Sequence, residues 1–178
     1  MAFNINDMRS GLALGGAKPS LFQVQISNPV TSLADLKAPF MIRAAALPAS
    51  TLTPIEVPYF GRKIKVAGDR TFDPWTVTVI NDEDFLVRNA MEQWMNSINS
   101  HTGNLRLATS YKAQATITQY GKAGNILRVY KFHGLFPTES TAIAMDWETD
   151  AIETFDVTFQ YDYWTVSGGV TGLAGTAQ

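Results

Sequence analysis

The chain has 178 residues, a length that fits about one domain and can bury a substantial core. Apolar residues make up 46% and charged residues only 17%, which excludes a chain kept unfolded by its own charge, and the absence of cysteine excludes disulfides, thiolate metal sites and thiol catalysis. The formal net charge of −2 argues against a strongly basic nucleic-acid-binding protein, and no apolar run approaches the roughly 20 residues that a membrane-spanning helix needs.

Charge is divided unevenly along the chain. Residues 1–131 carry all 14 Lys and Arg and nine acidic residues, a net of +5, whereas residues 132–178 carry seven acidic residues and no Lys or Arg, a net of −7. With so few charges to keep the surface wet, we expect partners to cover much of it. Opposed basic and acidic faces would favour head-to-tail self-association. The alternative is that both signs are scattered over one solvated surface.

The first 80 residues are predicted to form short strands separated by loops. Alternation of Phe22, Val24 and Ile26 with glutamines indicates a half-buried strand, and prolines end several of the later segments. The expected segments are a flexible arm over 1–20, a strand over 21–27, a loop over 28–39, a strand or helix over 40–47, an extended excursion over 54–67 with a strand at 62–67, a turn over 68–70 and a strand over 73–80.

The hydrophobic period then changes from two to 3.6, which predicts one long helix over about residues 82–99. Its apolar stripe consists of Val87, Met91, Trp94, Met95 and Ile98. Asn81 is the expected N-cap, and the acidic residues 82–84 would lie in the first turn, where the helix dipole favours negative charge. Gly103 is expected to end the segment.

Strand patterns return after the helix. A glycine-rich turn would join strands over 111–120 and 126–136 as a hairpin, with Pro137 ending the second, and 141–148 alternates as a further strand. In 152–164 one predicted face holds Phe155, Val157, Phe159, Tyr161 and Tyr163, and the other holds Asp156, Thr158, Gln160 and Asp162.

The predicted fold is mainly β: an antiparallel β-sandwich or barrel of about six to eight strands with one long α-helix packed on it. This domain would span residues 21–164, between the arm over 1–20 and a flexible, glycine-rich tail over 165–178.

The motifs predict no catalysis, cofactor or metal site. Residues 11–18 nearly match a phosphate-binding loop, but Ala17 separates the glycine from Lys18, Pro19 stands where Ser or Thr is required, and no strand precedes them. Asp146, Glu148 and Asp150 resemble the start of a calcium-binding loop, but the required glycine and the final glutamate are missing. The two histidines lie far apart in the sequence. We therefore expect a protein that is not an enzyme.

One cluster keeps a different class of function open. A combination of basic and aromatic residues binds single-stranded nucleic acid in some small β-barrels. Here the basic residues are Arg62, Lys63, Lys65 and Arg70, and the interleaved aromatic residues are Tyr59, Phe60 and Phe72. A solvated strand face or a protein interface would show the same pattern.

Five separated blocks of the sequence occur in a specific order. They are LFQVQI at 21–26, AALPAS at 45–50, the run 61–96 that contains AGDRTFDPWTVTVINDE, GLFPTE at 134–139 and IETFDVTFQYDYW at 152–164. Together these blocks resemble the tail tube proteins of contractile-tailed bacteriophages, over about residues 18–164. Tube proteins of type VI secretion systems and of phage-like bacteriocins are related to that family in fold.

The resemblance implies a structural subunit of a virion tail tube, assembled in the host cytoplasm. Six copies would form a ring, and stacked rings would form a hollow tube inside a contractile sheath. The implied partners are further copies of the chain, the sheath, tape-measure and tube-terminator proteins and the baseplate, without a membrane. Genome DNA would pass through without specific binding. A tube or tube-initiator protein of a related contractile injection system is the alternative within this class.

The resemblance also gives the polar and charged residues expected places. A lumen lined by Asp, Thr and Gln would let DNA slide, whereas clustered Lys and Arg would hold its phosphates. The lumen candidates are Asp156, Thr158, Gln160 and Asp162 on one strand, or Gln114, Thr116 and Thr118 on another. The excursion over 48–72 is the candidate for gripping the adjacent ring. The ring-to-ring candidates are Arg62, Lys63, Lys65 and Arg70, facing Asp146, Glu148 and Asp150.

Overall fold

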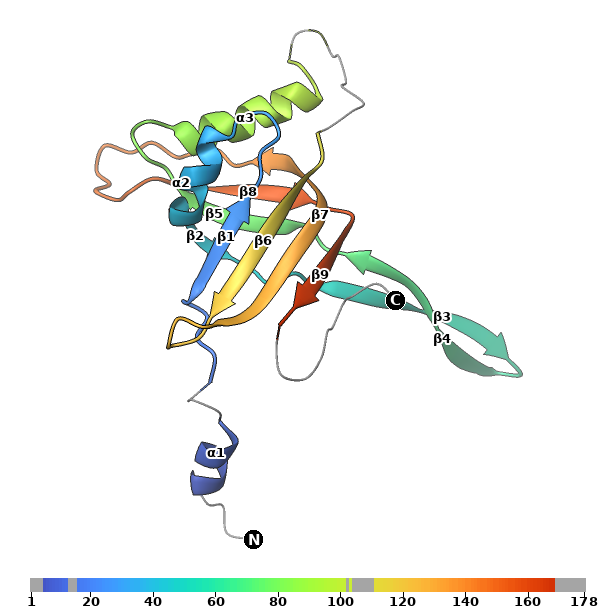
Figure 1. Cartoon of the computed structure of the whole chain (residues 1–178). Helices are drawn as coiled ribbons and strands as arrows, with labels where there is room; N and C mark the ends of the chain where they lie inside the picture. The colour runs from blue at the N-terminus through green and yellow to red at the C-terminus, as the bar shows by residue number, and fades with distance from the viewer. Residues whose placement is uncertain (1–4, 13–15, 102, 104–110, 169–178) are drawn as a thin grey trace.

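The computed structural model describes residues 5–12, 16–101, 103 and 111–168 (Figure 1). Its elements are α1 (Ile5–Gly11), β1 (Phe22–Ile26), α2 (Leu33–Met41), β2 (Ile42–Ala45), β3 (Ser50–Tyr59), β4 (Arg62–Phe72), β5 (Trp75–Ile80), α3 (Leu86–Ile98), β6 (Ala113–Tyr120), β7 (Ile126–Ser140), β8 (Thr154–Gln160) and β9 (Tyr163–Ser167). The prediction of a mainly β, antiparallel fold is confirmed. The described chain has nine strands and three helices, more of each than the sequence predicted, and none of these helices is long and apolar enough to span a membrane.

Two antiparallel sheets share one long strand, β7. Along its first half, β7 pairs with β6 on one side, which pairs in turn with β1, and with β9 on the other side. Its second half pairs with β8, and this sheet continues in the order β8-β5-β2. β7 has 15 residues and changes sheet at Gly134, where φ is +70°. Among the described strands no pairing joins β1 to β2. The fold is therefore a sandwich that is open at this edge, and not a closed barrel.

The core lies between the two sheets and under α3. The predicted alternation in β8 is confirmed, because Phe155, Val157 and Phe159 are all buried. Trp94 of α3 is fully buried, lies 6.2 Å from Phe159 between ring centroids, and donates its indole N–H to the carbonyl oxygen of Tyr111 at 2.8 Å. Helix α3 thus covers one end of the sandwich through its largest side chain.

Helix α3 begins later than predicted, and its predicted cap is wrong. Asn81 is buried at the end of β5, where its backbone N–H and its side-chain amide both donate to Glu153. It therefore ties β5 to the segment before β8 and is not available as an N-cap. The helix begins at Leu86, whose N–H donates to the carboxylate of Asp84. The acidic residues 82–84 lie before the first turn.

Several other boundaries also differ from the prediction. The predicted loop over 28–39 contains most of α2, and the predicted turn over 68–70 lies inside β4. Pro137 lies within β7 and does not end it. Residues 141–153 form a loop in place of the strand predicted over 141–148.

The ends of the chain are only partly covered by the structure. The N-terminal arm carries the short helix α1, and Figure 1 shows it hanging below the sheets. Residues 1–4, 13–15 and most of the predicted C-terminal tail, 169–178, lie outside the described residues.

Candidate assembly surfaces

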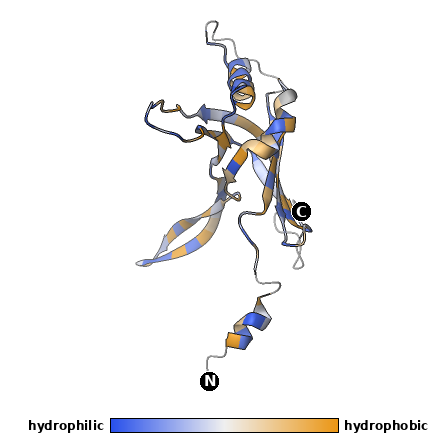
Figure 2. Ribbon diagram, turned by 90° about the vertical axis from the view of Figure 1, so that its left-hand side faces the viewer, coloured by the Kyte–Doolittle hydropathy of each residue, from blue (hydrophilic) through white to orange (hydrophobic). Residues whose placement is uncertain are grey.

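The segment over 48–72 forms a hairpin that projects from the body of the protein. Strands β3 and β4 pair only with each other in the described structure, and they extend away from both sheets (Figures 1 and 2). Their register pairs Ile55 with Val66 and Val57 with Ile64, so one face of the hairpin carries four β-branched side chains, each about half exposed. An exposed apolar face of this kind is typical of an interaction surface.

The basic residues of the hairpin lie mainly away from this apolar face. Lys63 donates to the carboxylate of Glu56 across the strands at 2.7 Å, and Lys65 pairs with Glu56 in register. The predicted separation of the lysines from Ile64 and Val66 is therefore confirmed. Arg62 begins β4 at the tip, and Arg70 lies near its base. The structure thus brings all four basic candidates onto one projecting element.

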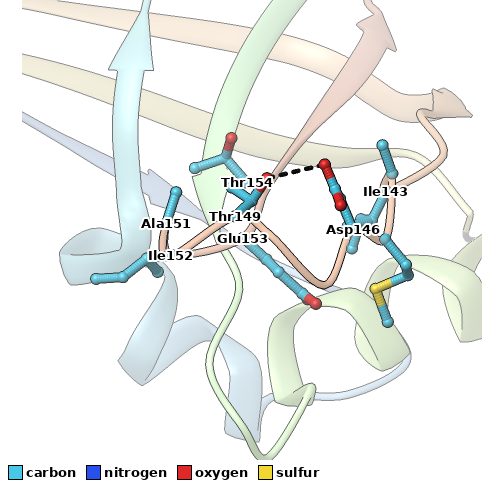
Figure 3. Close-up of a pocket in the computed structure, with 9 residues that line it drawn as sticks. Ile143, Asp146, Thr149, Ala151, Ile152, Glu153 and Thr154 are labelled. Atoms are coloured by element: carbon cyan, nitrogen blue, oxygen red, sulfur yellow. Dashed lines mark hydrogen bonds between the residues drawn. The ribbon is translucent and has the colours of Figure 1, made fainter.

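The acidic candidates lie on the exposed loop over 141–153. Asp146 accepts hydrogen bonds from the backbone N–H of Glu148 and from the hydroxyl of Thr149, and these fold the loop back on itself. Figure 3 shows the hydrogen bond from Thr149. The loop borders an open hollow of about 410 Å³, and Trp147 of the same loop is fully exposed. In Figure 1 this loop projects at the upper left, whereas the hairpin extends to the lower right. The basic and acidic candidates are therefore far apart within one copy and cannot pair there.

A second, adjoining hollow lies where this loop meets the start of α3. It has a volume of about 240 Å³, and its lining residues are Asn81, Asp82, Glu83, Phe85, Ile152 and Glu153. Phe85 and Ile152 are exposed, so the hollow has apolar side chains among carboxylates. We call it the Phe85 hollow.

Lys37 of α2 holds the acidic segment 82–84 in place. Its ammonium group forms ion pairs with both Asp82 and Asp84. Hydrogen bonding to Lys37 lowers the pKa of each carboxyl group below its ordinary value, and the same contacts raise the pKa of Lys37. The arrangement keeps two negative charges fixed beside the Phe85 hollow.

Replacing Lys37 with Met should raise the pKa of Asp82 and Asp84 toward the ordinary aspartate value, as measured by NMR titration of the side-chain carboxyl carbons. Because these folded-state pKa values are lowered, the pairs stabilise the fold above the ordinary pKa and lose their effect as pH falls through the lowered values. The difference in Tm between wild type and Lys37→Met should therefore disappear in acid. Lys131→Met is the control, and unchanged aspartate titrations in Lys37→Met would contradict the assignment.

The two sets of lumen candidates lie on different sheets. Asp156, Thr158 and Gln160 alternate with the buried residues of β8 and so point away from the core. Asp156 accepts a hydrogen bond from Thr78 of β5 at 2.7 Å, and the hydroxyl of Thr158 lies 3.2 Å from that of Thr76. These contacts form an ordered polar face across β5 and β8.

The second set lies on β6, in the other sheet. Gln114, Thr116 and Thr118 alternate there with the buried Ala115 and Ile117. Because the outward faces of the two sheets of a sandwich point in opposite directions, one of the two sets, and not both, is suited to line a channel.

Asp162 does not belong to the β8 face, which corrects the strand face predicted for this residue. Strand β8 ends at Gln160, and Asp162 lies in the connection to β9, where its N–H donates to the carbonyl oxygen of His133. Each oxygen of its carboxylate accepts a hydrogen bond from the ammonium group of Lys112, at 2.7 Å. Asp162 therefore has a structural role at the bend of β7. For the same reason Tyr163 leaves the predicted apolar face and is partly exposed.

The fold and these surfaces can be compared with known proteins. A sequence model of the phage tail tube protein family matches residues 17–167. The chain belongs to this family. The tail tube protein gp19 of Enterobacteria phage T4 is 40% identical over 153 residues, which cover 83% of this chain and 90% of that protein. The chain is thus homologous to a phage tail tube protein along most of its length.

Solved structures of contractile systems share the fold of this tail tube protein. A chain of the sheath–tube complex of the PVC extracellular contractile injection system has a TM-score of 0.61 at 18% identity and covers 86% of this chain and 92% of its own. The tube-terminating cap of the anti-feeding prophage has a TM-score of 0.67 at 19% identity and covers 95% and 100%. At these identities the likeness concerns the fold alone.

The sequence grouped Phe60 with the basic cluster but did not place it at a turn, and it did not single out Phe85. Phe60 forms the tip of the hairpin and is 92% exposed, and both Phe60 and Phe85 have positive φ, +41° and +50°. The sequence does contain a signal for a hairpin tip at this place, because Phe60 and Gly61 separate two segments rich in β-branched residues. The two prolines of β3 concealed this pattern.

Proposed function

We propose that the tail tube protein is a structural, non-catalytic subunit whose hexameric rings stack into a hollow tube that conducts genome DNA. The tube would assemble in the host cytoplasm with the baseplate, tape-measure and tube-terminator proteins and lie inside a contractile sheath in the virion. The observation that carries the proposal is the projecting hairpin, because its half-exposed apolar face has no partner within the described chain.

Ring formation would use the open edges of the two sheets. Strands β1, β2 and β9 each pair with one neighbour in the described structure, which leaves their other edges without a strand. Unpaired edges are unfavourable in a monomer, and neighbours around a ring would cover them. The sandwich does not close on itself, which fits a subunit that completes its sheets by assembly.

Stacking of the rings would use the hairpin and the acidic loop. These elements project at opposite ends of the molecule in Figure 1, and the hairpin carries Arg62, Lys63, Lys65 and Arg70. The loop carries Asp146, Glu148 and Asp150. Contact between opposite charges on unlike ends would repeat from copy to copy and so build a stack.

The lumen is assigned to the β5–β8 face that carries Asp156, Thr158 and Gln160. Neither β5 nor β8 contains Lys or Arg, so the middle of this face offers no cation to DNA phosphates, and the exposed Arg43 lies at its edge, on β2. On the other sheet Lys131 is exposed and pairs with Thr116 in register, which would place a cation beside the passing DNA. The acidic and hydroxyl-rich face is therefore better suited to a channel that DNA must leave freely.

Single cysteines test both the tube and the lumen, because the chain contains no native cysteine. Purified Thr158→Cys and Thr116→Cys proteins would be assembled, imaged by negative-stain electron microscopy, and treated with a small maleimide or with a maleimide on a long polymer. We expect both variants to form hollow tubes. In tubes of Thr158→Cys the introduced thiol should react with the small maleimide but not with the polymer, because the polymer cannot diffuse along the lumen. The dissociated subunits serve as the control, in which both positions should react with both reagents.

Two results would count against these assignments. Exclusion of the polymer at position 116 and free reaction at 158 would move the lumen to the other sheet. A wild-type protein that stays monomeric and binds single-stranded DNA tightly in a gel-shift assay would favour the nucleic-acid-binding alternative over the tube.

A further inference from the structure

The tip of the hairpin is built from a residue that does not suit the turn. Phe60 and Gly61 form the two-residue connection between β3 and β4, and both have positive φ, +41° and +80°. Turns of this kind favour Asn-Gly, because a side chain as large as Phe is strained in the left-handed region. Phe60 is 92% exposed, and its ring contacts the ring of Tyr59 edge-on, with 4.6 Å between the ring centroids. A strained, exposed aromatic residue at the end of a projecting element points to a contact with another molecule.

The Phe85 hollow has the size and chemistry to receive such a side chain. Its volume of about 240 Å³ exceeds that of an apolar cavity of about 150 Å³ that holds benzene. Phe85 and Ile152 supply exposed apolar surface, and Glu83 and Glu153 supply carboxylates at its margin. Phe85 itself has a positive φ of +50°, so this site also contains a strained aromatic residue.

The charges beside the two features are complementary. Arg62 follows the turn directly and lies on the same face of the hairpin as Tyr59, its partner in register. Lys63, by contrast, already pairs with Glu56 within the hairpin. Arg62 is therefore the cation best placed to meet Glu83 or Glu153 when Phe60 enters the hollow. Within one copy the tip lies across the body from the 141–153 loop that borders the hollow (Figure 1).

We propose that Phe60 of one copy seats in the Phe85 hollow of a second copy, with Arg62 paired to the acidic margin. This inference rests on the proposed function, because it supplies the contact through which copies stack. The contact joins unlike surfaces, so each copy offers a tip to one neighbour and a hollow to another, and the interaction continues along the assembly. Phe60 acts as the apolar anchor, and Arg62 sets its orientation.

The decisive variant is Phe60→Asn, which suits the turn better but removes the anchor. We expect its monomer to melt at the wild-type temperature or above, while the critical concentration for tube assembly rises at least tenfold, as measured by sedimentation and electron microscopy. Phe60→Trp keeps a ring that can fill the hollow and should stay within a few-fold of wild type. Ile152→Ser, in the hollow, should match Phe60→Asn in assembly without affecting the melting temperature of the monomer.

A charge exchange tests the pairing separately. Arg62→Glu and Glu83→Lys should each raise the critical concentration several-fold, and the double variant should recover most of the loss. Formation of Phe60→Asn tubes at wild-type concentrations would overturn the inference and leave the tube function intact. The same result is expected if Phe60 contacts a different protein, such as the sheath, and not a second copy of the chain. Failure of the wild-type protein to form tubes under any condition would instead count against the proposed function.

Discussion

Replacement of Trp94 with Ala should lower the free energy of unfolding of the tail tube protein monomer by about 3–5 kcal/mol. Trp94 is fully buried, packs against Phe159 of β8, and gives its indole N–H to the carbonyl oxygen of Tyr111. The substitution leaves a cavity between α3 and the sheets and an unsatisfied carbonyl oxygen, and both effects destabilise the fold. Urea denaturation followed by circular dichroism measures the change directly.

The chain supplies a matched control for this experiment. Trp147 is the same residue type but is fully exposed in the loop over 141–153. Trp147→Ala should change the free energy of unfolding by no more than about 0.5 kcal/mol, as surface substitutions usually do. Equal effects at the two positions would show that α3 is not anchored through Trp94.

Gly134→Ala should destabilise the protein by about 1–3 kcal/mol, because two effects act at this position. Its φ of +70° disfavours any residue with a Cβ, and a Cβ there would overlap the carboxylate of Asp162. Accommodating the methyl group would displace Asp162 and break its contact with Lys112. Thermal unfolding and two-dimensional NMR spectra would report the loss of stability and the change at the bend.

Gly124→Ala separates these two effects. Gly124 has a similar φ of +78°, but a Cβ added there would meet no atom within 4 Å. This variant should show only the backbone cost of a Cβ in the left-handed region, about 1 kcal/mol. A Gly134→Ala protein no less stable than Gly124→Ala would mean that the contact with Asp162 is not important for the bend.

Local hydrophobic pattern predicted the elements whose apolar face meets the core. In β8 the residues Phe155, Val157 and Phe159 are buried as predicted. In α3 the predicted Val87, Met91 and Trp94 are buried, but Met95 and Ile98 are only partly buried, and Ala90, which was not predicted, is buried as well. The same rule failed at residues 141–148, where Met145 and Trp147 alternate with polar residues but are exposed in a loop. Alternation indicates a strand only when a neighbouring strand and a core are present to receive it.

Other features depend on contacts that a single sequence does not display. Helix α2 is specified by packing of Ala34 and Ala38, which are small and buried, and its weak periodicity gave no helical signal before Pro39. β3 accepts Pro54 and Pro58 because a strand of a two-stranded sheet has a free edge, where a missing N–H costs little.

Only part of the candidate surfaces could be predicted, because the alternation along a strand is a local pattern. Strand parity correctly grouped Asp156, Thr158 and Gln160, and it separated Lys65 from Val66. It could not place Asp162, because a chain reversal between β8 and β9 ends the alternation two residues earlier. It also could not show that β6 and β8 belong to sheets with opposite outward faces, which depends on the bend in β7.

The sharing of β7 has a mechanical consequence for a tube. Because the strand runs through both sheets without a break, tension applied to one sheet reaches the other along peptide bonds as well as through side-chain packing. Sliding the layers apart would require extending the backbone or breaking two ladders of hydrogen bonds at once. In the proposed tube, a wall of such subunits would resist shear between its two layers.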